Sequence, residues 1–561
     1  MRLTRTVLAA LTATLLAACA TTGSPPASTA SIAIDVPDIA RPGGETPAWW
    51  YRAGAAQAAR NGAMTGRAKN VILFVGDGMS LTTVTAARIL AGQRAGAPGE
   101  EHRLAWEHFP ATALSRTYNT DAQTPDSAGT MTAMATGVKT RAGVLAVGQA
   151  SKRGDCAAAL DTPLLTLWEL AAGAGLATGV VTTTRVTHAT PAATFSHSPE
   201  RNWEDDTDVP EPARMAGCID IARQIVESPY GTGPDVLLGG GRGRFMTVEQ
   251  EDPEYADKVG QRLDGRDLVA AWKQRHPGGT YVWNAKDFNA APDGPLLGLF
   301  EPDHMQYEHD RPRDIAGEPN LADMTRAAIT RLSKDADGYV LLVEGGRIDH
   351  AHHLGNAHRA LTDTIAMSDA VQAAVDATGD DTLIVVTADH SHTLTFAGYP
   401  TRGNPMMGKV KGGVGEKIDP GAFALDATGL PYTTLSYANG PGYVGATSQQ
   451  PEGPKTYEHV ASGYQSAKNG RPNLTDVDTA HPDYMQEALV PATAETHGGD
   501  DVGIWATGPG SQAIRGSLEQ NVIYHLLLQA TPRLRAAACA RAACNADGVP
   551  VERVVPGAPT R

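Results

Sequence analysis

Cysteine, aromatic residues and basic charge are all scarce in this chain of 561 residues. It has five cysteines, 6% aromatic residues, and 47 lysines and arginines against 62 aspartates and glutamates, which gives a formal net charge of -15. This acidic balance argues against nucleic acid and anionic membrane surfaces as partners. It does not exclude an anionic substrate, because bound metal ions can reverse the sign of the charge locally.

Long apolar runs are missing after the N-terminus, so no later segment is expected to cross a membrane. Residues 1–18 have a charged start and a short apolar run, and we interpret them as a signal peptide. The run ends at Leu16-Ala17-Ala18-Cys19, which resembles a bacterial lipoprotein signal with lipidation of Cys19. An ordinary signal peptide with an incidental cysteine is the alternative. The lipoprotein interpretation predicts an exported protein anchored in the cell envelope, at the outer membrane or facing the periplasm.

The segment that follows, residues 19–45, is rich in Ala, Ser, Thr, Pro and Gly, and we expect a flexible tether. Four further cysteines are an even number in an exported chain, which predicts two disulfides. Three pairings are possible. We choose Cys539–Cys544, which closes a short local loop, together with Cys156–Cys218; buried free thiols are the alternative.

Short apolar runs alternate with helical patterns along most of the chain. The runs of strand length are residues 70–75, 178–183, 235–238, 340–343, 383–387 and 502–505, and helical patterns cover 164–174, 321–333 and 357–377. This alternation predicts an α/β fold with three layers, α/β/α, around a central, mostly parallel sheet. We expect one domain over residues 46–545, with an inserted crown-like surface subdomain at about 400–490 and a loose tail at 546–561.

Residue types that bind metals stand at the ends of several of these runs. They are aspartates, a glutamate and histidines: Asp77, Glu344, Asp349, His353, Asp389, His390 and His497. If the sheet is parallel, these side chains meet at one edge, where open α/β sheets place their active sites. Four carboxylates at close quarters repel one another unless cations neutralise them. The sequence therefore predicts at least two divalent ions, although each motif alone could be a solvated polar turn.

The mixture of ligand types indicates which ions these are. Oxygen and nitrogen ligands together suit catalytic zinc. Two such sets are present: Asp349, His353 and His497, and Asp77, Asp389 and His390. Glu344 with Asp77 and a hydroxyl is an all-oxygen set, which suits magnesium. In this arrangement Asp77 bridges two metals.

Ser127 is the candidate nucleophile. Small residues after it predict a helix to residue 136, and a serine at a helix N-terminus presents its hydroxyl and backbone N–H groups to an anion. A plain N-cap serine is the alternative. The lipase-type Gly-x-Ser-x-Gly motif is missing, and no histidine is evidently paired with Ser127. Its activation would have to come from a metal ion.

Several segments together resemble the alkaline phosphatase family, from about residue 49 to about residue 544. They occur in the family's order: Asp77-Gly78-Met79, Asp126-Ser127-Ala128, Thr183 to Pro191, Glu344 to His350, Thr387 to His392, and Thr496-His497-Gly498-Gly499. The likeness is closer to the vertebrate-type enzymes, on His188-Ala189-Thr190, Arg201-Asn202-Trp203, residues 281–308 and the two cysteine pairs. The resemblance implies hydrolysis of phosphate monoesters at alkaline pH through a phosphoserine, and a homodimer.

The resemblance also implies a role for each matching residue. The first zinc would be held by Asp349, His353 and His497. The second would be held by Asp77, Asp389, His390 and the Ser127 oxygen. Magnesium would be held by Asp77, Thr190 and Glu344, with His188 behind a bound water. Arg201 would clamp two phosphate oxygens, and Asp126 would orient it. Vertebrate-type members carry a calcium site, which here would use Glu254, the Phe300 carbonyl, Glu301 and Glu318; a solvated acidic loop is the alternative.

Some residues depart from the family pattern or have no role in it. Thr124 stands where the family usually has Val or Ile, and Met131 where it has a small residue. His350, His352 and His392 are additional histidines, expected behind the ligands or exposed. Trp49-Trp50-Tyr51 could form an arm on a partner subunit or an intramolecular aromatic patch.

Three other functions are weighed against this one. A phosphodiesterase is disfavoured by Arg201, since a bidentate clamp needs two free oxygens. A sulfatase would need a different motif around Ser127. A phosphate- or metal-binding lipoprotein without turnover would not need the complete set of catalytic residues.

Overall fold

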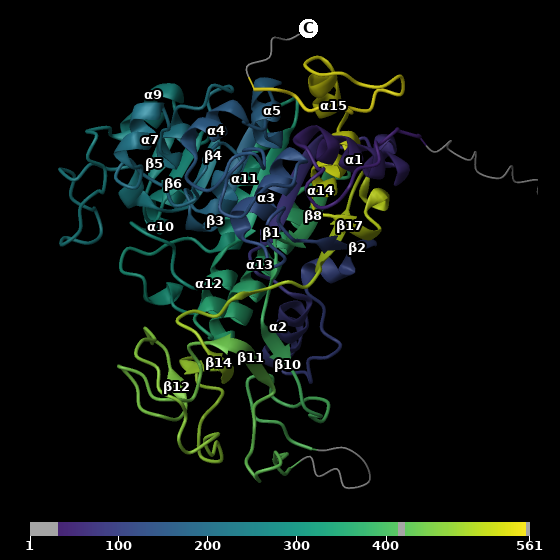
Figure 1. Ribbon diagram of the computed structural model, residues 1–561. Helices are drawn as coiled ribbons and strands as arrows, with labels where there is room; N and C mark the ends of the chain where they lie inside the picture. Colours follow the sequence, from purple (N-terminus) through teal and green to yellow (C-terminus); the bar gives the residue numbers. More distant parts are fainter. Residues whose placement is uncertain (1–31, 413–420, 557–561) are drawn as a thin grey trace, which may run out of the picture.

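The computed structural model describes residues 32–412 and 421–556, so the signal segment and Cys19 lie outside the described residues. Its centre is a ten-stranded sheet with the order β17-β2-β16-β8-β1-β7-β3-β4-β6-β5 (Figure 1). The strands are β1 (Asn70–Gly76), β2 (Ala111–Arg116), β3 (Ala177–Arg185), β4 (Val236–Gly240), β5 (Thr280–Val282), β6 (Leu296–Leu299), β7 (Tyr339–Gly345), β8 (Thr382–Ala388), β16 (Val502–Thr507) and β17 (Gly516–Glu519). All neighbouring pairs are parallel except those of β16, which runs antiparallel to both β2 and β8. The α/β fold with a mostly parallel sheet is confirmed.

The sheet is covered on both faces, and its central strands β1, β7 and β8 are buried at every position. In β1, Val71, Leu73 and Val75 pack on one side and Ile72 and Phe74 on the other. The helices of the first side are α1 (Pro47–Arg60), α3 (Ser127–Thr136), α5 (Leu167–Gly173), α14 (Val522–Ala530) and α15 (Pro532–Cys539). Those of the second side are α2 (Leu81–Arg94), α11 (Leu321–Leu332) and α13 (Ala357–Ala377). This alternation of burial gives three layers.

Shorter helices lie in the connections between strands. They are α4 (Cys156–Asp161), α6 (Ala189–Ala192), α7 (Glu211–Ala216), α8 (Ile221–Val226), α9 (Leu268–Arg275), α10 (Ala285–Ala290) and α12 (Arg347–His353). Both predicted disulfides are present, Cys156–Cys218 and Cys539–Cys544. None of the helices in the described part of the chain has both the length and the hydropathy to cross a membrane.

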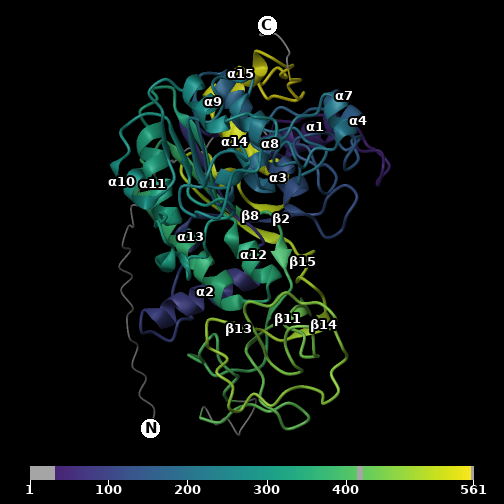
Figure 2. The same cartoon turned by 90° about the vertical axis from the view of Figure 1, so that its left-hand side faces the viewer.

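The inserted segment forms a separate lobe at the bottom of both views, at the opposite end of the molecule from α15, which lies at the top (Figures 1 and 2). Its described residues contain no helix between 400 and 490. The lobe is built on small sheets: β10 (Leu394–Phe396), β11 (Leu435–Gly440) and β14 (Ala488–Pro491) in one, and β12 (Lys455–Thr456) with β13 (Tyr484–Met485) in another. Two short strands, β9 (Ser391–His392) and β15 (His497–Gly498), pair at its junction with the main sheet.

Both ends of the described chain are more firmly attached than the sequence suggested. Residues 32–45 have no helix or strand, but Ile32 and Ile34 pack against Val549 and Val551. The expected tether therefore does not extend over these residues, and the expected loose tail is wrong for 546–556, because apolar side chains at both ends bury one another. Trp50 and Tyr51 are buried within their own chain on α1, so the aromatic patch is intramolecular.

Candidate active site

The polar residues meet where the three central strands end. The registers place Gly76 of β1 beside Gly345 of β7 and Ala388 of β8, so Asp77, Glu344 and Asp389 gather at one edge. His497 reaches the same edge for a different reason from the one expected. Because β16 is antiparallel to β8, the loop before it lies beside the carboxyl end of β8. A parallel strand would have put His497 at the opposite edge.

The first metal set is formed by Asp349, His353 and His497. Asp349 and His353 stand four residues apart on α12 and share one face. The Nε2 of His497 lies 3.1 Å from the Nε2 of His353 and 3.4 Å from Asp349 Oδ1. The Nδ1 of His353 donates to the Glu495 carbonyl at 2.5 Å, and that of His497 to the Pro125 carbonyl at 2.7 Å. Both Nε2 lone pairs therefore point inward, which is the arrangement of a metal site.

His392 also lies in this set but is not free to bind a metal. Its Nε2 is 2.6 Å from Asp349 Oδ1 and its Nδ1 is 2.5 Å from Glu495 Oε2, so both nitrogens contact carboxylates. Burial alone would lower the pKa of His392, but Glu495 and Asp349 raise it to about 10. Burial alone would raise the pKa of Asp349, but His353 and His392 lower it well below its usual range. His392 therefore orients Asp349, as expected for an additional histidine.

The other two additional histidines also lie behind the ligands. His352 is buried, with its Nδ1 2.7 Å from the Tyr437 hydroxyl. His350 is held at 2.9 Å by Arg347, and its ring lies 5.2 Å from that of His188. Burial lowers the pKa of both rings well below the usual range. His304, which the sequence analysis did not single out, lies 4.2 Å from the His350 ring.

The second metal set is Asp77, Asp389 and His390, and it touches the candidate nucleophile. The Nε2 of His390 is 3.2 Å from Asp389 Oδ2, 3.4 Å from Asp77 Oδ1 and 3.2 Å from the Ser127 hydroxyl. All four residues are buried. Burial, followed by the charges of Asp389, Asp349 and Glu344, raises the pKa of Asp77 well above its usual value. Divalent cations would remove this electrostatic penalty.

The third set, Asp77, Glu344 and His188 together with Thr190, is marked by unsatisfied polar atoms. Several buried polar atoms of the described chain lack a hydrogen-bond partner, and four of them belong to this set: Asp77 Oδ2, Glu344 Oε1, Thr190 Oγ1 and His188 Nδ1. The other oxygen of Glu344 accepts from Thr182 and Thr184. Burial raises the pKa of Glu344 to about 7. Buried polar atoms are rarely left unpaired, so their concentration here fits a bound cation with its waters.

Ser127 is placed by Asp126 and faced by Arg201. Asp126 caps α3 by accepting from the Gly129 backbone N–H at 3.1 Å, which leaves Ser127 as the first helical residue. The second oxygen of Asp126 accepts from Arg201 at 3.2 Å, and Arg201 reaches His188 Nε2 at 3.1 Å. Burial would raise the pKa of Asp126, but Arg201 and backbone N–H groups lower it below its usual value. Asp126 thus remains an anion that orients Arg201.

A further acidic cluster lies away from this edge and adds one acid to the predicted set. It consists of Glu254, Glu301 and Asp314, with Phe300 next to Glu301 in sequence. Both carboxylate oxygens of Asp314 are buried without a partner among the described residues. Glu318, the predicted fourth acid, lies beside this group: one of its oxygens accepts from the Gln306 backbone at 3.0 Å, the other is buried without a partner among the described residues, and burial together with the charges of Glu301 and Asp314 raises its pKa well above the usual value. Asp314 was not predicted from the sequence, and the structure brings it to Glu254 and Glu301.

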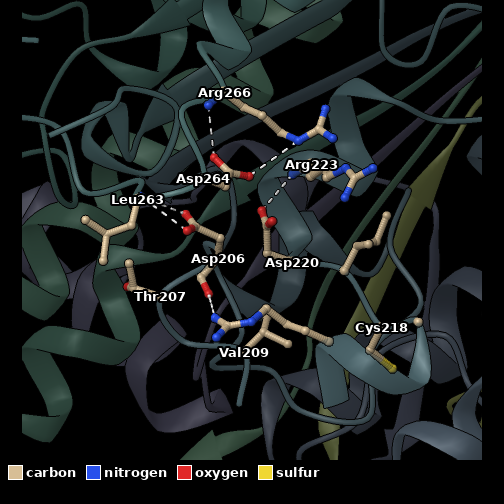
Figure 3. A pocket seen from close by; sticks show the side chains of 12 residues that line it. Asp206, Thr207, Val209, Cys218, Asp220, Arg223, Leu263, Asp264 and Arg266 are labelled. Atoms are coloured by element: carbon tan, nitrogen blue, oxygen red, sulfur yellow. Dashed lines mark hydrogen bonds and ion pairs between the residues drawn. The ribbon is translucent and has the colours of Figure 1, made fainter. Parts of the chain in front are cut away.

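A separate cavity of about 730 Å³ contains none of the predicted catalytic or metal-binding residues (Figure 3). Asp206, Asp220 and Asp264 line it. In Figure 3 the Arg266 guanidinium meets Asp264, at 3.5 Å, and the Arg223 backbone N–H donates to Asp220 at 2.9 Å. Asp220 binds Arg262 through both oxygens, at 2.9 and 3.0 Å, and Asp264 binds Arg262 at 2.7 Å. These charges are therefore matched within the protein, and the chemistry lies at the sheet edge.

Comparisons with known proteins agree with this geometry. A family profile described as alkaline phosphatase matches residues 68–532. The tissue-nonspecific alkaline phosphatase of Gallus gallus is 42% identical over 500 residues, covering 86% of this chain and 89% of that protein. The Homo sapiens isozyme is 42% identical over 476 residues, covering 83% and 84%.

Solved structures show the same fold. The alkaline phosphatase of Thermus thermophilus is 26% identical with a TM-score of 0.57, covering 83% of this chain and 92% of that one. The alkaline phosphatase of the Antarctic bacterium TAB5 is 21% identical with a TM-score of 0.53, covering 83% and 98%, and supports the fold alone.

Proposed function

Since the chain belongs to the alkaline phosphatase family and hydrolyses phosphate monoesters, we propose that Ser127 is its nucleophile and forms the phosphoserine. The observation that carries this proposal is the position of the Ser127 hydroxyl, 3.2 Å from His390 Nε2 and 3.4 Å from Asp77 Oδ1. Ser127 is also the first residue of α3, whose N-terminal N–H groups and macrodipole favour an approaching anion.

Arg201 would bind the phosphoryl group. Its guanidinium presents planar donors that match two phosphate oxygens, and Asp126 fixes its orientation. A monoester has three non-bridging oxygens, so two can meet the guanidinium while the third faces the proposed metal ions, whereas a diester has only two non-bridging oxygens. Positioning and charge stabilisation together account for most catalysis of phosphoryl transfer.

We assign two zinc ions and one magnesium ion to the three metal sets. Asp349, His353 and His497 would hold one zinc, and Asp77, Asp389, His390 and Ser127 the other. Asp77, Glu344 and Thr190 would hold magnesium, with His188 behind a coordinated water. These ions would supply charge neutralisation at the serine and leaving-group oxygens and an acidified water. A solved variant of the TAB5 enzyme has Mg bound in its M3 site.

Calcium is proposed for the separate acidic cluster. Glu254, Glu301 and Asp314 offer three carboxylates whose ligand atoms lie within 4.8 Å of one another. With the Phe300 carbonyl they form the all-oxygen set that calcium prefers. Burial raises the pKa of Glu301 to about 7, and a divalent cation would offset this cost.

Three properties of the whole protein remain proposals from the sequence. They are export through residues 1–18, lipid anchoring at Cys19 in the cell envelope, and a homodimer. Mass determination of the membrane-extracted protein tests the first two, and sedimentation at micromolar concentration tests the third.

The catalytic proposal is tested by hydrolysis of a chromogenic monoester, diester and sulfate at alkaline pH, with and without chelator. We expect monoester turnover that needs metal and is lost in Ser127→Ala. Ser333→Ala, a surface serine at the end of α11, is the control. Acid quenching followed by mass spectrometry should find phosphate on Ser127. Full monoester turnover by Ser127→Ala would refute the assignment.

A further inference from the structure

We propose that Glu495 is a positioning residue for the first metal set, acting on Asp349 through His392 and on His353 through its backbone. The inference rests on the proposed function, because it concerns how the chain orients the ligands of a zinc ion. Glu495 lies between β14 and β15, where the chain returns from the inserted lobe to the main sheet. It is 1% exposed, so its carboxylate is isolated from bulk water.

The carboxylate of Glu495 is held by three donors. Its Oε2 is 2.5 Å from His392 Nδ1, and its Oε1 accepts from the backbone N–H of Thr393 at 2.6 Å and from the Thr393 hydroxyl at 2.5 Å. A buried charge is tolerated when hydrogen bonds satisfy it, and three donors from two adjacent residues fix its orientation. Glu495 therefore sets the position of the His392 ring.

His392 in turn orients the carboxylate of Asp349. Its Nε2 lies 2.6 Å from Asp349 Oδ1, while Asp349 Oδ2 faces His353 Nε2 at 3.4 Å. The ring of His392 is packed at 4.8 Å from that of His352, which the Tyr437 hydroxyl holds from the root of the lobe at 2.7 Å. His392 thus has neither a free nitrogen nor room to rotate, and it fixes the Asp349 carboxylate.

The backbone of Glu495 acts on the second ligand. Its N–H donates to the His353 carbonyl at 2.8 Å, and its carbonyl accepts from His353 Nδ1 at 2.5 Å. This contact fixes the tautomer that leaves His353 Nε2 free for a metal. One residue therefore orients two of the three protein ligands. Loss of such outer partners typically weakens metal affinity by about 10–100-fold.

A purely structural role for Glu495 makes a different prediction. If Glu495 only fastened the lobe to the main sheet, its loss would lower the stability of the metal-free protein and leave zinc affinity unchanged. A positioning role requires weaker zinc binding even where the metal-free fold is intact. The affinity of the metal-free protein for zinc is therefore the deciding quantity.

The experiment is competition for zinc between metal-free protein and a chromophoric chelator. Glu495→Gln keeps the shape and the backbone contacts but removes the charge, and we expect one zinc ion to bind about 10–100-fold more weakly. Glu487→Gln is the matched control, because Glu487 contacts Arg471 in the lobe and no metal ligand. His392→Gln should weaken zinc to a similar extent. The double variant should bind zinc only slightly more weakly than either single variant, because Glu495 and His392 act on Asp349 through the same contact.

Wild-type zinc affinity in Glu495→Gln, with a native near-UV circular dichroism spectrum, overturns the inference. A lower Tm of the metal-free variant without a change in affinity overturns it as well. If Glu495→Gln does not fold, His392→Gln becomes the deciding variant, and wild-type zinc affinity in His392→Gln would also overturn the inference. Failure of the wild type to bind zinc would overturn the proposed function and this inference with it, so the two failures are distinguishable.

Discussion

The Nε2 atoms of His353 and His497 lie 3.1 Å apart, although the Nδ1 of each ring already donates to a backbone carbonyl. Two lone pairs therefore face each other across this gap. A cation between the rings converts their repulsion into attraction and also neutralises Asp349 beside them.

Removing metal should therefore lower the stability of the folded protein as well as stop turnover. We expect excess chelator to lower the Tm, and zinc to restore it. A ligand at 100 times its Kd stabilises the folded state by about 2.7 kcal/mol. Differential scanning calorimetry measures the change. The double variant His353→Ala/His497→Ala should respond much less to zinc, and an identical response would contradict the assignment.

Replacing Arg201 by lysine should impair phosphate recognition although the charge is kept. The guanidinium reaches Asp126 and His188 through different nitrogens, a geometry that an ammonium cannot reproduce. We expect kcat/KM for a monoester to fall about 10–100-fold and inhibition by inorganic phosphate to weaken similarly, since a charged hydrogen bond contributes about 1.5–3 kcal/mol. Arg153→Lys, an exposed arginine paired with Glu200, is the control. Equal losses in both variants would argue against a specific clamp.

Calcium should depend on Asp314 more than on Glu318. The ligand atoms of Asp314 gather with those of Glu254 and Glu301 within 4.8 Å, whereas one oxygen of Glu318 is already engaged by the Gln306 backbone. We expect Asp314→Asn to weaken calcium binding at least about tenfold, and Glu318→Gln to have a smaller effect. Isothermal titration calorimetry of calcium-free protein measures both. A larger loss in Glu318→Gln would instead favour Glu318 as the main acid added to Glu254 and Glu301.

Asp363 should make stability fall as the pH rises. Burial raises its pKa to about 8, against an ordinary value of 3.8, even though Arg347 opposes the shift. The folded protein therefore holds a proton that the unfolded chain releases near pH 4. The resulting stability is present in acid, declines by at most about 1.4 kcal/mol per pH unit, and is lost above the folded pKa.

The variant Asp363→Asn removes this titration. Its stability relative to wild type should increase between pH 5 and pH 8 and then level off. Urea unfolding at four pH values measures the difference, with the exposed Asp376→Asn on the same helix as control. Parallel curves for wild type and Asp363→Asn would show that Asp363 does not titrate in this range.

Much of the fold could be predicted from the sequence, because burial on both faces leaves a plain signal. All six predicted strands exist, and the pattern at 357–377 gave the bounds of α13. Four strands at the sides of the sheet, β2, β5, β6 and β17, were missed. They are short, and β2 alternates buried and exposed residues rather than forming an apolar run. The periodic pattern of apolar residues reflects which side chains are buried, so its signal is weakest in strands that are only partly buried.

The candidate site could be predicted to the extent that its residues carry motifs. Asp77, Ser127 and His390 meet as expected. Asp314 and Glu495 were missed, because their importance arises from contacts between segments far apart in the chain. Glu495 meets Thr393 across 102 residues, a relationship that no local pattern records. A glutamate two residues before His497 was the only signal available.

The position of β16 between β8 and β2 affects how the protein is made. Strands β2 and β8 are complete by residue 388, but the strand that joins them is synthesised only at residues 502–507. Until then each has an open edge ready to pair with another chain. His497 leaves the ribosome only shortly before that strand. A chain truncated before His497 would therefore lack both a histidine of the first metal set and β16, which leaves two strands with open edges, so truncation should favour aggregation over partial activity.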